Sequence, residues 1–230
     1  MSFKQALGLK EMQNKSSDKF KSISQITSGV YSILSIPFIF DAYQKLIGSD
    51  DFMKRYVREF ICPFPDARIL DIGCGTAQVL KYLPENIEYV GYDLNPDYIE
   101  EASKKYKGRG DFYCERISDF SITKVNYFDI ALAGGVLHHI NDEEAKKLFE
   151  MTSHLLKPGG CLITYDGVYI EGQSKLAKYI LSKDRGKYVR THKQYINLAR
   201  NSFSNIESLI IHDMYKIPYT AIIMKIVRSK

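Results

Sequence analysis

The sequence of 230 residues has no closely spaced cysteine pair, no long hydrophobic run and no internal repeat. Its four cysteines form no C-x-x-C pair and no Cys/His cluster at the spacing of zinc ligands, so we expect a reduced, intracellular protein without a metal. The N-terminal residues show no signal-peptide pattern. The longest apolar stretch, 30–40, spans 11 residues and contains Pro37. A membrane-spanning helix needs about 20 residues. We therefore expect a cytoplasmic protein without a transmembrane helix.

Charge is unevenly distributed along this chain of ordinary globular composition. The formal net charge is +5, made up of +3 in residues 1–60, −5 in residues 61–165 and +7 in residues 166–230. This asymmetry indicates that the basic flanks meet a phosphate, a carboxylate or a membrane surface. A solvated lysine-rich face explains it equally well. The length favours one large domain with an embellishment rather than two full domains.

From residue 67 onward, short apolar runs alternate with helix-like patterns, as is typical of a parallel α/β sheet. Predicted helices lie at 77–84, 96–106 and 141–156. The last two strands are separated by a short turn, so we expect them to be antiparallel. The predicted strands are 67–73, 87–94, 111–117, 127–135, 161–167, 206–214 and 219–229. Together they predict a doubly wound, mostly parallel seven-stranded sheet with an antiparallel last strand.

Two segments do not follow this alternation. Residues 1–60 are predicted to form two or three helices, which we interpret as an N-terminal cap over the carboxyl edge of the sheet. Residues 61–230 would then form the main domain. Within it, about 168–200 is predicted to be a helical insertion between the fifth and sixth strands.

A glycine turn follows the first predicted strand, in "ILDIGCGTA". Gly73 permits a tight turn, and Gly75 lets backbone N–H groups approach a ligand. Asp93 ends the second strand, 22 residues after Asp71, where a carboxylate accepts hydrogen bonds from ribose hydroxyls. Nicotinamide dinucleotide binders and S-adenosylmethionine binders share this arrangement.

Two residues around the turn favour the methyl donor. The dinucleotide fingerprint requires a small residue where this chain has Gln78. Asp71, two residues before the first glycine, would repel a pyrophosphate but suits an ammonium or sulfonium group.

Five motifs in order resemble those of the class I S-adenosylmethionine-dependent methyltransferases, over about residues 67–166. The motifs are "ILDIGCGTA", "VGYDLNPDYIE", "ERISDF", "FDIALAGGVLHHI" and "LKPGGCLIT". The resemblance implies a Rossmann-like fold and S-adenosylmethionine as the cofactor. A third glycine that is frequent in the family is replaced here by Ala77.

The resemblance also implies which residues contact the cofactor. One group would surround its methionine part, and the other its ribose and adenine. The first group is Asp71, Gly73, Gly75, Ala133 and Gly134, and the second is Asp93, Leu94, Asp119 and Phe120.

Candidates for contact with the acceptor are less specific. His138 and His139 follow the fourth strand, where a histidine could take a proton from a hydroxyl acceptor. The alternative is that this pair packs against or caps the next helix. Further candidates for substrate contact are Tyr31, Asp166 and His192.

The segment 171–200 has eight basic and two acidic residues, and its part 173–183 resembles a membrane-surface helix. We therefore predict methylation, at oxygen, of a small, sugar- or lipid-like acceptor. The basic residues would suit an anionic acceptor or a peripheral membrane contact. A lid over a small soluble acceptor is the alternative role of this segment. Nucleic acid is not favoured, because no RNA-binding module or aromatic platform accompanies the basic residues. The other functions left open are a nicotinamide-dependent oxidoreductase and a non-catalytic membrane- or protein-binding module.

Overall fold

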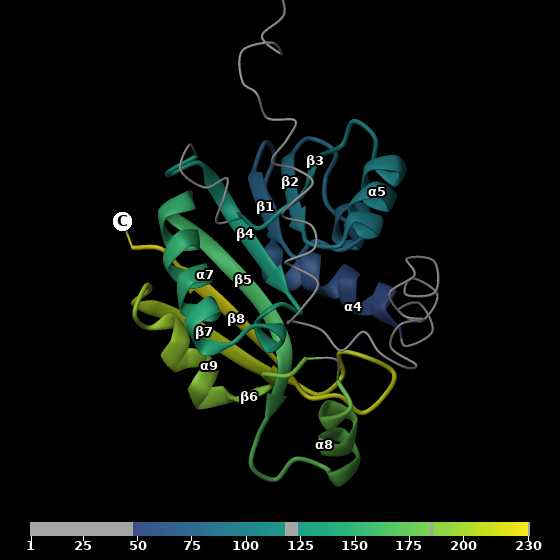
Figure 1. The fold of residues 1–230 in the computed structure, drawn as a ribbon, viewed down its shortest axis with the longest axis vertical. Coiled ribbons are helices and arrows are strands. Elements are labelled where there is room, and N and C mark those ends of the chain that lie inside the picture. Colours follow the sequence, from purple (N-terminus) through teal and green to yellow (C-terminus); the bar gives the residue numbers. More distant parts are fainter. Residues whose placement is uncertain (1–47, 118–123, 185, 230) are drawn as a thin grey trace, which may run out of the picture.

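A computed structural model describes residues 48–117, 124–184 and 186–229 of the chain, and its centre is a twisted sheet (Figure 1). Neighbouring strands follow the order β3-β2-β1-β4-β5-β8-β7, and the two-residue β6 pairs with β5. Strand β8 runs antiparallel to both of its neighbours. The strands are β1 Arg68–Ile72, β2 Glu88–Asp93, β3 Asp111–Cys114, β4 Phe128–Gly134, β5 Leu156–Tyr169, β6 Arg190–Thr191, β7 Asn205–Ile211 and β8 Ala221–Val227. The predicted sheet of seven strands with an antiparallel last strand is confirmed.

Helices cover both faces of the sheet, and each face has its own hydrophobic core. On one face, α7 and α9 pack on a cluster that includes Leu70 and Val90. On the other face, α4 and α5 pack on a cluster that includes Ile69 and Tyr89. Consecutive residues of a strand therefore point to opposite faces and belong to different cores, as the two-residue period of a strand requires. The helices and helical turns are α4 Ser49–Tyr56, η2 Val57–Ile61, η3 Gln78–Lys81, α5 Pro96–Lys105, η5 Leu137–His139, α7 Asp142–Leu155, α8 Lys175–Ser182 and α9 His192–Ala199.

Both predicted helix starts after β2 and β4 are confirmed. The Asn95 side chain accepts a hydrogen bond from the Asp97 N–H at 3.0 Å, and Pro96 occupies the first helical position of α5. At α7, Asn141 and Glu144 form a reciprocal capping box. Each cap satisfies backbone N–H groups that the first turn leaves without helical partners.

The helix predicted over 77–84 is wrong. Only η3, a single 3₁₀ turn at Gln78–Lys81, forms there. Ala77 precedes it in the left-handed region (φ 53°), and Pro84 follows it closely. The segment between these two residues is too short for the amphipathic helix that its pattern of Val79, Leu80 and Leu83 indicates. These three side chains are nevertheless buried in the core on the α4 face.

Strand β5 begins earlier than predicted, directly after α7. Its pairing with β4 is interrupted at the "KPGG" sequence, because Phe128 pairs with Leu156 and the next pair is Ile130 with Cys161. The extra residues bulge out of the ladder, which agrees with the proline and glycine turn expected at this point. The predicted insertion after β5 contains α8, β6 and α9.

The predicted N-terminal cap lies mostly outside the described residues, since only 48–60 of it are described. In this part, α4 buries Phe52 and Tyr56 against the α4 face of the sheet, and Val57 continues the contact into η2. The boundary between an N-terminal cap that ends at residue 60 and a main domain that begins at residue 61 stays a prediction. In the described part of the chain, no helix combines the length and the apolar character needed to cross a membrane. All four cysteines are free thiols.

Candidate active site

A cleft lies between α4 and the carboxyl ends of β1 and β4. This edge of an open α/β sheet is where ligands generally bind. Its lining residues come from α4, β1, the following turn, β4 and β5. They are Met53, Tyr56, Asp71, Gly73, Cys74, Gly75, Thr76, Gln78, Val79, Leu132, Gly134 and Tyr165.

The two glycines of the turn have the conformations expected of them. Gly73 has φ 71° and Gly75 has φ 55°, in the left-handed region that favours glycine. Among the described residues, no heavy atom beyond the chain neighbours of Gly75 lies within 4 Å of the position that a Cβ there would take. The turn therefore leaves a space next to its backbone in which a ligand fits without a side chain in the way.

Asp71 is a buried carboxylate facing this cleft. The Tyr89 hydroxyl donates a hydrogen bond of 2.5 Å to its Oδ2 atom. Burial raises the pKa of Asp71 to about 7, although the hydrogen bond from Tyr89 acts in the opposite direction. An uncompensated carboxylate of this kind favours a cationic ligand, because the positive charge would stabilise its ionised form.

Asp93 connects the end of β2 to the glycine turn. Its Oδ2 atom accepts a hydrogen bond from the Gly75 N–H (2.9 Å) and its Oδ1 atom from the Asn95 N–H (2.8 Å). Burial raises the pKa of Asp93, against these hydrogen bonds. Leu94 beside it is 53% exposed. Asp119 and Phe120 lie outside the described residues.

The end of β4 differs in detail from the prediction. Gly134 lines the cleft, whereas the Ala133 side chain is fully buried in the core on the α7 face. Ala133 therefore has only its backbone left for a ligand. The alternation of side chains along β4 turns Leu132 toward the cleft instead. The role of Ala133 in cofactor binding stays a prediction, which the buried side chain limits to its backbone.

Tyr165 was missed by the sequence reasoning. It lies near the end of β5, where its ring meets those of Phe52 and Tyr56 edge to face, with centroid distances of 5.3 and 5.0 Å. A Cβ on Gly134 would collide with the Tyr165 ring. Glycine at position 134 thus leaves room for the Tyr165 ring, which lines the cleft next to Tyr56 of α4.

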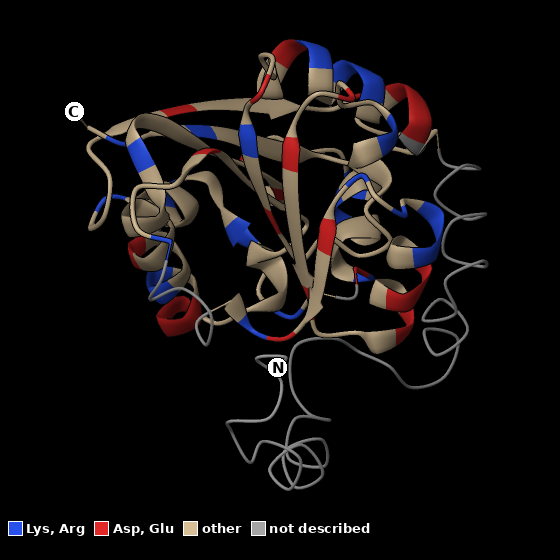
Figure 2. Ribbon diagram, turned by 90° about the horizontal axis from the view of Figure 1, so that it is seen from above, with Lys and Arg blue, Asp and Glu red and all other residues tan. Residues whose placement is uncertain are grey.

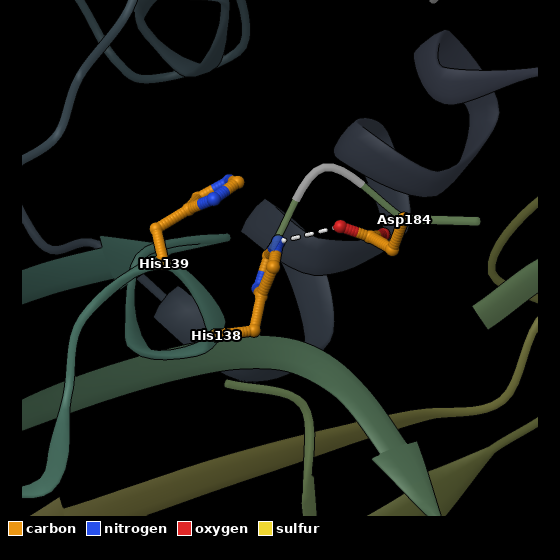
Figure 3. A group of neighbouring side chains, drawn as sticks. All are labelled: His138, His139 and Asp184. Atoms are coloured by element: carbon orange, nitrogen blue, oxygen red, sulfur yellow. Dashed lines mark ion pairs between the residues drawn. The ribbon is translucent and has the colours of Figure 1, made fainter. Parts of the chain in front are cut away.

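His138 is held between the carboxylates of Asp166 and Asp184, and Figure 3 shows its ion pair with Asp184. Its Nδ1 atom lies 2.7 Å from Asp166 Oδ1, and its Nε2 atom lies 3.3 Å from Asp184 Oδ1. Burial disfavours the imidazolium ion, but the hydrogen bonds to both acids outweigh burial and raise the pKa of His138 to about 10. Burial also opposes ionisation of Asp184, yet hydrogen bonds from His138 and from neighbouring groups hold its pKa well below the usual range. With both nitrogens engaged, His138 is poorly placed to act as a general base.

The insertion after β5 fixes the turn that contains His138 and His139. The buried Arg190 donates hydrogen bonds to the carbonyl oxygens of Leu137 (2.6 Å) and Ile140 (2.8 Å). The Tyr188 N–H donates to the His138 carbonyl oxygen at 2.9 Å. The half-buried His139 ring lies against His138, with a centroid distance of 4.1 Å. Of the predicted pair, His139 is the one with a partly exposed ring.

The remaining predicted substrate residues occupy different places. Asp166 is buried and accepts hydrogen bonds from His138, so it supports that side chain rather than facing the cleft. His192 begins α9, which packs on the opposite face from α4, and its Nε2 atom lies 2.8 Å from Ser208 Oγ. The structure therefore does not bring His192 to the cleft. Tyr31 lies outside the described residues.

Residues 70–162 match the family model described as a methyltransferase domain. This part of the chain is therefore a methyltransferase domain. Among the proteins similar to it is phosphoethanolamine N-methyltransferase of Triticum aestivum, 30% identical over 145 residues, which are 60% of this chain and 28% of the relative. Another is ubiquinone biosynthesis O-methyltransferase of Xylella fastidiosa (strain 9a5c), 32% identical over 104 residues, which are 44% of this chain and 42% of the relative.

A solved structure supports the fold of this methyltransferase domain. Phosphoethanolamine N-methyltransferase 2 of Haemonchus contortus, in complex with S-adenosyl-L-methionine, matches with a TM-score of 0.66 and 18% identity over 89% of this chain and 59% of that one. The chain spans less than half the length of the curated relatives named above. Their names include both nitrogen and oxygen acceptors, so the comparisons leave the acceptor atom open.

Proposed function

We propose that this protein transfers a methyl group from S-adenosylmethionine to a hydroxyl oxygen of a small, sugar- or lipid-like acceptor. The observation that carries the proposal is the cleft under α4, where Asp71, the glycine turn and Gly134 come together. The cofactor has a cationic amino-acid part, which a buried carboxylate attracts. The same carboxylate would repel the pyrophosphate of a nicotinamide dinucleotide, which disfavours the oxidoreductase alternative.

The residues of the turn fit the two ends of this cofactor. Asp71 would pair with the ammonium group, and the open space at Gly75 would accept the chain that follows it. The Asp93 carboxylate accepts hydrogen bonds from the backbone N–H groups of Gly75 and Asn95, and it would also accept hydrogen bonds from the ribose hydroxyls. The exposed Leu94 side chain would lie against the adenine. These roles for Asp93 and Leu94 follow the family resemblance.

The chain contributes mainly by position and by excluding water. When bound, the cofactor supplies a methyl group, the electron pair of the broken C–S bond stays on sulfur, an oxygen lone pair forms the C–O bond, and the hydroxyl proton leaves to a base or to water. Holding donor and acceptor in line contributes up to about 7 to 11 kcal/mol in favourable cases. Tyr56 and Tyr165 form the apolar walls that would hold both reactants in place.

The acceptor would approach from the side of the cleft that leads to η5. Gly135 links the cleft to this turn, since a Cβ on Gly135 would lie 3.9 Å from the Tyr165 ring and 3.7 Å from His138 Cε1. His138 is buried, whereas His139 is half-buried, so His139 is the member of the pair that would meet the acceptor.

The surface of α8 supports a lipid-linked acceptor at an anionic membrane surface. Leu176 (56% exposed) and Tyr179 (61% exposed) lie among the exposed Lys175, Lys178 and Lys183. This combination of apolar and basic side chains is typical of interfacial helices. Elsewhere the charge is mixed, and Figure 2 shows acidic and basic residues side by side on the helices.

Cofactor binding and turnover test the proposal separately. Titration calorimetry should detect binding of S-adenosylhomocysteine but not of NAD. Release of S-adenosylhomocysteine should then depend on addition of a hydroxylated sugar or lipid acceptor. Binding of NAD alone would refute the methyl-donor assignment. Cofactor binding without turnover on any acceptor would favour a non-catalytic module.

Vesicle sedimentation tests the α8 surface. We expect the chain to sediment with vesicles that contain anionic lipid and to lose this binding in a Lys175→Gln/Lys178→Gln/Lys183→Gln variant. Arg190 must stay unchanged, because it is buried and holds η5 rather than facing solvent. A matched control replaces Lys104, Lys105 and Lys107 at the end of α5 by Gln. Equal binding by both variants would contradict the assignment to α8.

A further inference from the structure

We infer that His138, His139 and Asp184 form a binding site for a divalent transition-metal ion of the zinc type. One donor atom from each of these residues lies within 4.8 Å of the other two (Figure 3). Two imidazole nitrogens and one carboxylate oxygen are ligands that zinc prefers over the all-oxygen sets of Mg²⁺ or Ca²⁺. The ion would lie between His138 Nε2 and Asp184 Oδ1, which are 3.3 Å apart.

Hydrogen bonds orient two of these ligands, as in established metal sites. The Asp166 carboxylate lies 2.7 Å from His138 Nδ1, which directs Nε2 toward Asp184. A carboxylate on the far nitrogen of a histidine ligand is a recurrent arrangement around zinc. Asp184 is held in turn by the Gly186 N–H (2.8 Å) and by the Tyr219 hydroxyl (2.9 Å). These hydrogen bonds would hold the donor atoms of His138 and Asp184 in position before an ion binds.

The surroundings of the ligands are rigid. Arg190 and Tyr188 fix the backbone of η5 from the insertion, as described above. A Cβ on Gly186 would collide with the His138 ring, so the insertion can pass this close only at a glycine. A metal ion requires its ligand atoms at defined positions. The contacts of η5 and Gly186 hold the backbone that carries these ligands.

Charge and exposure also fit a cation. Asp166 and Asp184 both face His138, so two carboxylates and one imidazolium carry a net charge of −1. With a divalent ion bound to a neutral imidazole, the same group would be neutral. The nearby Arg190 already pairs with Asp142. His139 and Asp184 are partly exposed, while His138 is buried. Three protein ligands with an accessible remaining position are typical of catalytic rather than structural zinc.

The location gives the ion a role in the proposed reaction. His138 adjoins Gly135, which adjoins Tyr165 and the cofactor cleft. A hydroxyl bound to the ion would have a lower pKa and would stand on the acceptor side of the cleft. This role rests on the proposed methyl transfer, whereas the metal site itself does not.

Metal titration of the full chain tests the site. The protein is treated with a chelator, dialysed and titrated calorimetrically with zinc chloride, with magnesium chloride as a comparison. We expect one zinc ion per chain and much weaker binding of magnesium. Cobalt(II) should give the intense visible absorption of a four- or five-coordinate site. Loss of an outer-shell partner typically costs about 10- to 100-fold in metal affinity, and we expect this for Asp166→Asn.

Ligand variants decide whether the assignment is correct. His139→Ala and Asp184→Asn should each lower zinc affinity more than Asp166→Asn does, while His154→Ala on the exposed part of α7 should leave it unchanged. Absence of one-to-one zinc binding, or equal affinity in wild type and His139→Ala, would overturn the inference and identify the cluster as an ion pair. His139→Ala keeps the test valid if Asp184→Asn does not fold. Binding of S-adenosylhomocysteine is measured in parallel, so that failure of the metal site and failure of the proposed function are distinguishable.

Discussion

The buried carboxylate of Asp71 makes a quantitative prediction about the dependence of stability on pH. Burial places its pKa at about 7 in the folded chain, against 3.8 for the unperturbed group. The folded chain therefore binds more protons than the unfolded chain between these two values, and its free energy of unfolding falls as pH rises through this window. Each pKa unit corresponds to about 1.4 kcal/mol, so the full loss is about 4 kcal/mol above pH 7.

Asp71→Asn tests this value, because asparagine stays neutral and its side-chain oxygen still accepts the hydrogen bond from Tyr89. Between pH 5 and pH 8 the wild type should lose about 3 kcal/mol more than the variant, measured by urea denaturation of both. Tyr89→Phe removes the donor that favours the ionised form, so its loss of stability should extend to higher pH. Equal losses in wild type and Asp71→Asn would refute the reasoning from burial.

The same ionisation should govern cofactor binding. Only the ionised carboxylate pairs with the ammonium group of S-adenosylhomocysteine, and at pH 6 about one tenth of the chains would carry it. The dissociation constant at pH 6 should thus be about tenfold higher than at pH 8 in the wild type. In Asp71→Asn it should be weak and nearly independent of pH over this range. A wild-type affinity that does not change with pH would remove Asp71 from the ammonium site.

Three further substitutions test the remaining geometry. Gly134→Ala should displace the Tyr165 ring, lower the free energy of unfolding by about 1 to 3 kcal/mol and weaken the calorimetric binding of S-adenosylhomocysteine. Unchanged stability together with unchanged binding would contradict the close approach of the ring to Gly134. Arg190→Lys should lower the free energy of unfolding, measured by urea denaturation, by about 3 kcal/mol, because one ammonium group cannot reach both carbonyl oxygens and Asp142. A loss below measurement error would show that η5 does not depend on these contacts. Asp93→Ala should weaken cofactor binding by about 1 to 3 kcal/mol, whereas unchanged affinity in calorimetry would exclude Asp93 from the ribose site.

Local signals were sufficient for most of the fold. The strands from β1 to β5 were predicted from apolar runs bounded by turn residues, and α5 and α7 from their Asn caps. The helix at 77–84 failed because Ala77 adopts a left-handed conformation that its residue type does not indicate. The two-residue β6 carries no pattern of its own, since it forms only where the insertion returns to β5.

The sequence by itself determined the order of the elements and the glycine turn, because these depend on residues that are close in the chain and repeat with a regular period. The resemblance of its motifs to a known family predicted the cofactor class. Only the tertiary structure decided which side chains meet. Asp166 and Asp184 lie 28 and 46 residues after His138, and their contact with its ring depends on how β5 and the insertion pass η5. Burial likewise raises the pKa of Asp71, against the hydrogen bond from Tyr89 of the neighbouring strand β2, and both effects depend on how the chain folds. For this reason the sequence offered His138 as a candidate but gave no sign that its side chain is held between two carboxylates.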